Sequence, residues 1–226
     1  MWNPNETLPE SFLKLPYQVY AGDPLWNPEG SQMVGFSFSA HNPYFMKNKA
    51  WVGVEDGKTR LAGFYDPDLR IEGKTAAYFG YWESMDELAP NEKLFQEFEG
   101  WAKSLGVDCV YGPINFSTFS SYRIRLNTFE GGAFQGEPYN PSYYATILEK
   151  MGYTCYRGYF SQMLGMETTA QKVERKRDSF KIAPEAEDFS FKLMDGAMML
   201  EALPDIYEMI DAIFGGNLGY TPIPYE

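Results

Sequence analysis

The chain has 226 residues, 44% hydrophobic and 17% aromatic, which is enough apolar material to bury the core of one full-sized domain. Nineteen Lys and Arg against 31 Asp and Glu give a formal charge of −12. This charge opposes binding to nucleic acid, because phosphate neutralisation needs clustered cations. No segment approaches the apolar length that spans a bilayer, and the first residues lack the pattern of a signal peptide, so we expect no membrane partner and a cytoplasmic location.

Cysteine and histidine are too scarce for a disulfide scaffold or a metal site. Cys109 and Cys155 each lie in an apolar segment typical of a strand, so we expect both to be reduced core residues. The single histidine, His41, has no cysteine or histidine nearby in the sequence. We therefore expect no metal and no histidine-based catalytic triad.

The first quarter of the chain predicts a helix followed by a hairpin. Apolar spacing favours a short helix over residues 10–20, weakened by Pro16. A polar connection over residues 23–48 follows, and it is long enough to carry a ligand contact. Residues 50–54 and 60–65 then read as two strands joined at Asp56-Gly57, a pair typical of hairpin turns.

The middle of the chain predicts a parallel crossover. Residues 75–83 form an aromatic strand with one internal glycine, Gly80, which often marks a bulge or a close backbone approach. Residues 90–105 carry an apolar stripe at helical spacing, with Gly106 placed to end the helix. Residues 107–111 return as a buried strand, which completes a strand, helix, strand unit.

The last part predicts shorter elements. A helix over residues 142–151 ends at Gly152, and a strand follows over residues 153–163. Residues 172–180 are charged, and a strand over 189–194 and a helix over 203–214 come after them. Leu203-Pro204 loosely repeats Leu15-Pro16 near the start of the chain, either because a second domain begins here or by chance.

Four segments resemble a known family. They are FGYWE (79–83), GPINFS (112–117), YNPSYY (139–144) and EKMGY (149–153). Together with the element order, they are similar to the GNAT superfamily of N-acetyltransferases, and within it to a bacterial family of long tandem proteins often labelled YghO-like. The resemblance covers roughly residues 10–225.

The resemblance implies a fold and a domain plan. The fold class is α/β (α+β), with a GNAT-like mixed central sheet flanked by helices. Residues 1–168 would form a GNAT-like domain, residues 169–187 a charged linker, and residues 188–226 the start of a second, apparently truncated GNAT-like domain. A second GNAT-like half of a longer chain is thus an expected partner.

A cofactor follows from the same resemblance, acetyl-CoA or another acyl-CoA. In working GNAT domains, backbone N–H groups of a glycine-rich loop bind the pyrophosphate at the start of the central helix. Here that place is residues 84–92 (SMDELAPNE), which contain no glycine and no cation. Acidic side chains at a helix start stabilise the helix and repel a pyrophosphate, so a well-capped helix without ligand is the competing interpretation.

Two residues are candidates for catalysis. Amine acylation needs a base and often an acid. Glu83, at the end of the aromatic strand, is the candidate base, and burial beside Tyr81 and Trp82 would raise its pKa; otherwise it is a solvated carboxylate. The family's usual acidic tyrosine falls at Leu148, and Tyr144, one turn earlier on the same helix face, is its candidate substitute or a core residue.

Other residues are candidates for binding a cofactor. Asn115 and Ser117 follow the carboxyl end of a strand, where open α/β sheets bind ligands, although both types are also common in turns. The candidates are Tyr81, Trp82, Asn115, Ser117, Asn140 and Tyr143. Arg123 and Arg125 are the nearest cations for an anionic ligand, unless they are solvated.

Two functions of different classes follow. The first is acyl-CoA-dependent N-acyl transfer to a small-molecule amine, with a degenerate pyrophosphate loop. The alternative is a non-catalytic GNAT-like domain that binds a ligand or supports a second, catalytic half. Acyl transfer from an aminoacyl-tRNA is a third option, which the acidic charge opposes.

Overall fold

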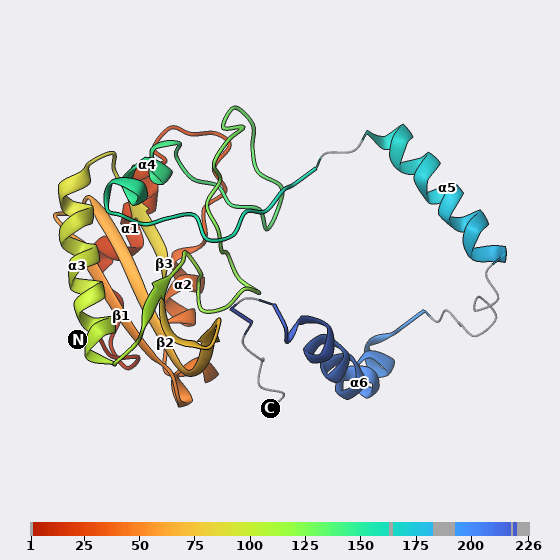
Figure 1. The fold of residues 1–226 in the computed structure, drawn as a ribbon, viewed down its shortest axis with the longest axis horizontal. Coiled ribbons are helices and arrows are strands. Elements are labelled where there is room, and N and C mark those ends of the chain that lie inside the picture. Colours follow the sequence, from red (N-terminus) through yellow and green to blue (C-terminus); the bar gives the residue numbers. More distant parts are fainter. Residues whose placement is uncertain (1, 163–164, 183–192, 218, 221–226) are drawn as a thin grey trace. The chain divides into compact units, whose positions relative to one another are not determined.

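A computed structural model describes residues 2–162, 165–182, 193–217 and 219–220. Its contacts divide the chain into two units, residues 1–154 with 210–226 and residues 155–209. Figure 1 shows that the first unit combines a sheet with packed helices. The predicted α/β class with a mixed central sheet is confirmed.

The sheet contains four strands in the order β1-β2-β3-β4. Three are antiparallel neighbours: β1 (Lys49–Glu55), β2 (Thr59–Ile71) and β3 (Lys74–Ser84). β4 (Cys109–Tyr111) pairs parallel to β3. The predicted hairpin is confirmed at Asp56-Gly57, where both residues have positive φ, 49° and 65°.

Helices cover both faces of this sheet. On one face, α1 (Glu10–Val19) and α2 (Ser31–Ser37) pack over an aromatic core that includes Phe12, Phe38 and Phe64. On the other face, α3 (Leu88–Ser104) and α4 (Tyr143–Lys150) enclose a second core. Its buried members include Phe79, Leu94, Phe95, Phe98 and Trp101.

The predicted crossover and its helix ends are confirmed. β3, α3 and β4 form the parallel strand, helix, strand unit. Gly106 and Gly152 follow α3 and α4 with φ of 74° and 88°, which is the left-handed conformation that glycine adopts without steric cost.

Several local predictions were wrong. The connection over residues 23–48 contains α2 and a short 3₁₀ helix, η1 (Pro43–Met46). Residues 153–162 form no strand, so the expected strand over 153–163 is absent from its described part. Cys155 lies in this segment and is exposed, whereas Cys109 is half-buried in β4. The aromatic residues of this segment resembled a strand, but Tyr156, Tyr159 and Phe160 are exposed.

The second unit contains α5 (Met166–Ile182) and most of α6 (Gly196–Phe214). The segment expected as a charged linker, 169–187, lies in α5 as far as it is described. The expected strand over 189–194 falls mainly outside the described residues, and residues 193–194 form no strand. The helix expected over 203–214 is part of α6, which continues through Pro204.

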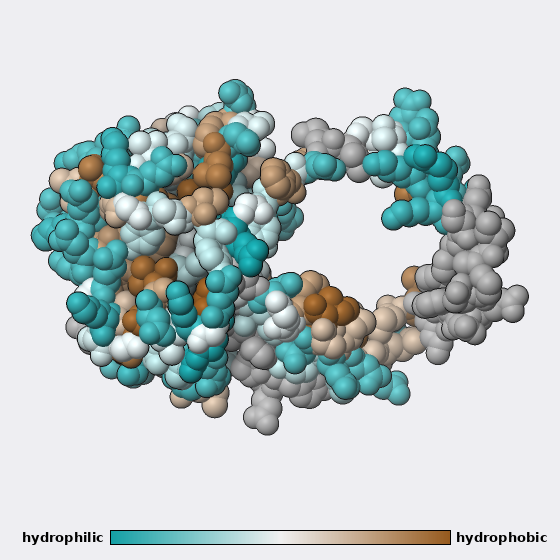
Figure 2. All heavy atoms as spheres, in the orientation of Figure 1, coloured by the Kyte–Doolittle hydropathy of each residue, from teal (hydrophilic) through white to brown (hydrophobic). Residues whose placement is uncertain are grey.

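The two C-terminal helices differ in surface character. Figure 2 shows α5 as mainly hydrophilic and α6 as carrying apolar side chains, among them the exposed Leu200 and Leu203. Within the described part of the chain, no helix is long and apolar enough to cross a membrane.

Candidate functional site

A β-bulge in β3 directs Glu83 toward α1. Opposite Leu61 of β2, β3 inserts an extra residue, and Tyr81 takes a positive φ of 49°. Side chains alternate between the faces of a strand, so an extra residue exchanges the faces beyond it. Tyr78 and Tyr81 therefore pack in the same core cluster, and Glu83 continues on the face that α1 covers.

Gly80 and Asn115 hold this bulge in place. A Cβ atom at Gly80 would collide with the carbonyl oxygen of Ile114 and lie 2.7 Å from Asn115 Oδ1. The same Oδ1 accepts a hydrogen bond from the Tyr81 backbone N–H at 2.7 Å. The glycine predicted to mark a bulge or close approach thus marks both.

Two tyrosine hydroxyls enclose the carboxyl group of Glu83. Oε2 of Glu83 accepts hydrogen bonds from Tyr20 at 2.9 Å and from Tyr144 at 2.6 Å. Tyr144 in turn accepts from the Ser84 N–H at 2.7 Å, and Tyr20 also lies 3.2 Å from the Tyr139 carbonyl oxygen. The two predicted catalytic residues are therefore in direct contact.

Burial dominates the electrostatics of Glu83. Loss of water raises the pKa of its carboxyl above the usual 4.5, while the nearby Arg60 and the two tyrosine hydroxyls lower it. Burial and the Glu83 charge raise the pKa of Tyr20 and Tyr144 far above 10. Both tyrosines are thus neutral hydrogen-bond donors at physiological pH.

Arg60 is the cation behind this carboxyl. It pairs with Glu83 across β2 and β3 and is only 4% exposed. Its guanidinium donates to the Phe12 carbonyl oxygen at 2.7 Å and lies 4.6 Å from the centre of the Phe12 ring. Buried charges persist where partners compensate for the lost water, and the charge of Arg60 offsets part of the burial that raises the pKa of Glu83.

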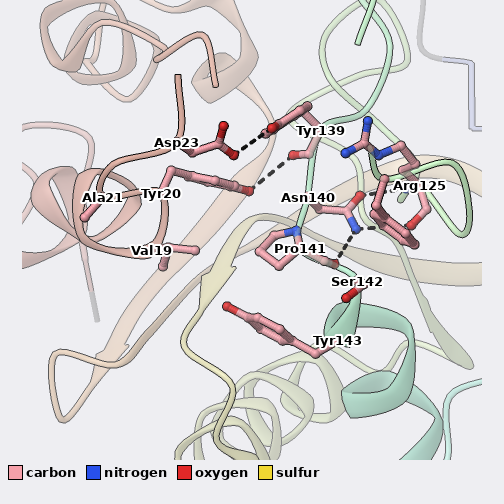
Figure 3. A pocket seen from close by; sticks show the side chains of 11 residues that line it. Val19, Tyr20, Ala21, Asp23, Arg125, Tyr139, Asn140, Pro141, Ser142 and Tyr143 are labelled. Atoms are coloured by element: carbon pink, nitrogen blue, oxygen red, sulfur yellow. Dashed lines mark hydrogen bonds between the residues drawn. The ribbon is translucent and has the colours of Figure 1, made fainter. Parts of the chain in front are cut away.

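A pocket of about 270 Å³ lies next to Glu83 and is separated from it by Tyr20. Figure 3 shows that the end of α1 forms one side of it and the segment entering α4 forms the other. Tyr20 lines the pocket and also contacts Glu83, while the Tyr143 hydroxyl donates to the Ser84 carbonyl oxygen at 2.7 Å. The pocket thus adjoins the carboxyl end of β3, where α/β sheets commonly bind ligands.

Asp23 and Arg125 bring opposite charges to this pocket, on either side of Tyr139 (Figure 3). The Tyr139 hydroxyl donates to Asp23 Oδ2 at 2.6 Å, and the Arg125 guanidinium lies 4.6 Å from the Tyr139 ring centre. This hydrogen bond, together with the backbone N–H of Leu25, lowers the pKa of Asp23. Asp23 is therefore ionised at neutral pH.

The predicted binding residues separate into two groups. Asn140 and Tyr143 line the pocket, as does Arg125. The Asn140 amide holds the chain locally, because Oδ1 accepts from the Arg125 N–H at 2.6 Å and Nδ2 donates to the Arg125 carbonyl oxygen at 3.1 Å. Asn140 shapes the pocket through these bonds.

Four other candidates lie outside the pocket lining. Tyr81 packs in the aromatic core under α1, and Trp82 donates from Nε1 to Asn91 Oδ1 at 2.9 Å. Asn115 supports the bulge, and Ser117 accepts from the Phe119 N–H at 3.3 Å in a turn. Arg123 also lies outside the lining, with its guanidinium 4.3 Å from the Tyr122 ring centre and 3.8 Å from Glu137.

The start of α3 does not fit a pyrophosphate. Asn91, fully buried, donates to Ser84 Oγ at 2.6 Å and to the Glu87 carbonyl oxygen at 2.7 Å, which closes the turn before the helix. Pro90 lacks an N–H, and Lys58 is paired with Glu87 at 2.6 Å. A pyrophosphate here would find the turn closed by Asn91, no backbone N–H at Pro90, and Lys58 already paired with Glu87.

Among the described residues, no group of three or more His, Cys, Asp or Glu side chains is arranged to hold a metal ion.

Sequence reasoning did not single out Tyr20, Asp23 and Tyr139, whose polar groups line the pocket. Tyr20 and Asp23 follow a predicted helix end, and Tyr139 precedes a predicted helix start. The sequence pattern therefore indicates a helix terminus or a turn at each of them. Only the pairing of residues more than a hundred positions apart reveals their role.

Comparison of the chain with protein families, with curated proteins and with solved structures gives no match.

Proposed function

We propose that residues 1–154 form a GNAT-like domain that binds a small polar molecule in the pocket between α1 and α4. The observation that carries this proposal is the pocket itself, which combines aromatic walls with one cation and one anion and adjoins a buried carboxyl of raised pKa. Pockets with a few convergent polar groups and perturbed titrating residues are typical of functional sites.

The element order supports the GNAT-like part of this proposal. A helix, three antiparallel strands, a crossover helix, a parallel strand and a further helix follow one another as the resemblance implies, with α2 and η1 as additions before the first strand. The missing strand after α4 departs from that expectation. The assignment to the superfamily therefore rests on the first 150 residues.

Acyl-CoA is not part of this first proposal, because the start of α3 is closed by Asn91 and bordered by acidic side chains. A pocket of about 270 Å³ also lies below the size typical for drug-sized ligands. It suits a molecule much smaller than a coenzyme.

Acyl transfer to a bound amine is a second candidate, favoured by the contact between Tyr20 and Glu83. An ammonium group in the pocket would release its proton to the Tyr20 oxygen while Tyr20 passes its own proton to the Glu83 carboxylate, 2.9 Å away. This relay needs Glu83 ionised, and the acyl donor would have to be held elsewhere than at the start of α3.

Calorimetry with acetyl-CoA, a longer acyl-CoA and a panel of small amines, acids and amino acids tests the first proposal. We expect saturable binding by members of the small-molecule panel and no heat from either CoA ester. Micromolar binding of an acyl-CoA, with transfer of its acyl group to a panel amine, would contradict ligand binding alone and support the second candidate.

We propose a cytoplasmic location, which is consistent with the two free cysteines, Cys109 and Cys155. We also propose that a second GNAT-like half is the partner of this domain. The exposed apolar side chains of α6 offer a contact surface for it.

A further inference from the structure

Neither of the two charges of the pocket forms a salt bridge within the described part of the chain. Among the described residues, Arg125 has no carboxylate within 4 Å and Asp23 has no cationic group within 4 Å. Arg125 donates from one terminal nitrogen to the Gly131 carbonyl oxygen at 2.9 Å, and its buried Nε has no hydrogen-bond partner. A guanidinium binds carboxylates through two parallel hydrogen bonds, and no carboxylate within 4 Å of Arg125 occupies that position among the described residues.

Aromatic rings fix the Arg125 side chain. Its guanidinium carbon lies 4.6 Å from the ring centre of Tyr139 and 5.1 Å from that of Phe129. Such stacking reduces the side-chain freedom that would be lost when a ligand binds. Arg125 is thus held at the pocket in advance of binding.

Asp23 retains acceptor capacity on the opposite side. It accepts from the Tyr139 hydroxyl at 2.6 Å and from the Leu25 N–H at 2.9 Å. A carboxylate has about four acceptor positions, so Asp23 can still accept a hydrogen bond from a ligand. The Tyr139 ring lies between Asp23 and Arg125, so the two charges face the pocket from either side of one tyrosine (Figure 3).

We propose that this pocket binds a free α-amino acid, with the ligand carboxylate on Arg125, its ammonium group on Asp23 and its side chain toward the tyrosine walls. The inference rests on the proposed function, because it names the ligand class of the same pocket. A plain amine would leave Arg125 without a partner, and a plain acid would leave Asp23 without one. Each loss removes a charge-assisted hydrogen bond.

The test is a calorimetric titration with the twenty protein-forming L-amino acids, singly. For each one that binds, the matching amine without the carboxylate and the matching acid without the ammonium are titrated as well. We expect at least one amino acid to bind saturably, and both of its analogues to bind about tenfold more weakly or worse, as the loss of one hydrogen bond to a charged group predicts.

Variants locate the binding. Arg125→Gln and Asp23→Asn should each weaken that amino acid about tenfold or more. Arg70→Gln is the matched control, because Arg70 is exposed at the far end of β2 and it should leave affinity unchanged. Thermal melts of all variants check that each one folds. If Arg125→Gln does not fold, the affinity of Asp23→Asn still tests the proposal.

Two different failures are distinguishable. If amines or acids bind the pocket as tightly as amino acids, or if affinity survives both substitutions, the amino-acid inference is overturned while small-molecule binding stands. If nothing in the amino-acid, amine or acid panel binds, the proposed function falls together with the inference.

Discussion

Glu83 has hydrogen-bond partners for both of its protonation states. When it is ionised, Oε2 accepts from both Tyr20 and Tyr144. When it is protonated, it can donate to the Tyr20 oxygen, while Tyr20 turns its own proton to the Tyr139 carbonyl oxygen, 3.2 Å away. A carboxyl that keeps hydrogen-bond partners in both protonation states suits a proton relay. The hydroxyl of Tyr20 connects Glu83 to the pocket.

The raised pKa of Glu83 makes a prediction for stability. A carboxyl whose pKa is higher in the folded state stabilises most below its unfolded pKa, and that contribution is lost as pH rises through the folded value. In Glu83→Gln this dependence is absent. The stability of the natural chain relative to the variant should therefore fall by about 1.4 kcal/mol for each pH unit within that window.

Urea unfolding of both chains from pH 4 to pH 9 measures this difference. The other titratable groups near Glu83, namely Arg60, Glu29, Tyr20 and Tyr144, are common to both chains. A difference that is constant with pH, or that grows as pH rises, would contradict a raised pKa.

Residue types alone predicted part of the site. Glu83 stood out because it ends an aromatic strand, and Tyr144 because it shares a helix face with Leu148; the structure brings these two together. Tyr81 and Trp82 lie outside the pocket lining, because the bulge that sets their faces depends on the conformation at Gly80 and Asn115. Sequence periodicity does not reveal such a shift.

At the scale of elements, the bulge in β3 is the feature that positions the site. Its extra residue directs Glu83 to the α1 face, and the close approach of the Ile114 backbone requires glycine at position 80. Local signals predicted β3, α3 and their crossover because apolar spacing and capping glycines agree there. The strand expected after α4 failed because aromatic composition alone does not create a pairing partner.

Gly80→Ala tests the close approach. The new methyl group would collide with the Ile114 carbonyl oxygen, so we expect a loss of about 2 kcal/mol or more in the free energy of unfolding. Gly100→Ala is the matched control: Gly100 lies within α3, and nothing is within 4 Å of an added Cβ. It should instead stabilise by up to about 1 kcal/mol.

Denaturant midpoints of the two variants provide the comparison. If Gly80→Ala is as stable as Gly100→Ala, then the backbone of residues 114–115 does not pack against β3 as described, and the bulge loses its explanation.

At the scale of the whole molecule, acidic residues are in excess, so a cation held at a pocket indicates where an anionic group can bind. A formal charge of −12 disfavours anions over the surface as a whole. Arg125 is held by aromatic rings beside a pocket within this acidic background. An anionic group can pair with Arg125 at this position, and Asp23, which lines the same pocket, favours a ligand that also carries a positive charge.

The most direct test of the central claim is to locate ligand binding by amide chemical shifts in the ¹⁵N-labelled chain. The chain is titrated separately with acetyl-CoA and with the amino acid that binds most tightly in calorimetry. We expect the amino acid to shift the amides of Tyr20, Asp23, Tyr139, Asn140, Ser142 and Tyr143, and acetyl-CoA to leave the amides of residues 84–89, 91 and 92 unchanged. Saturable acetyl-CoA shifts at the start of α3, with no response from the pocket, would contradict the account.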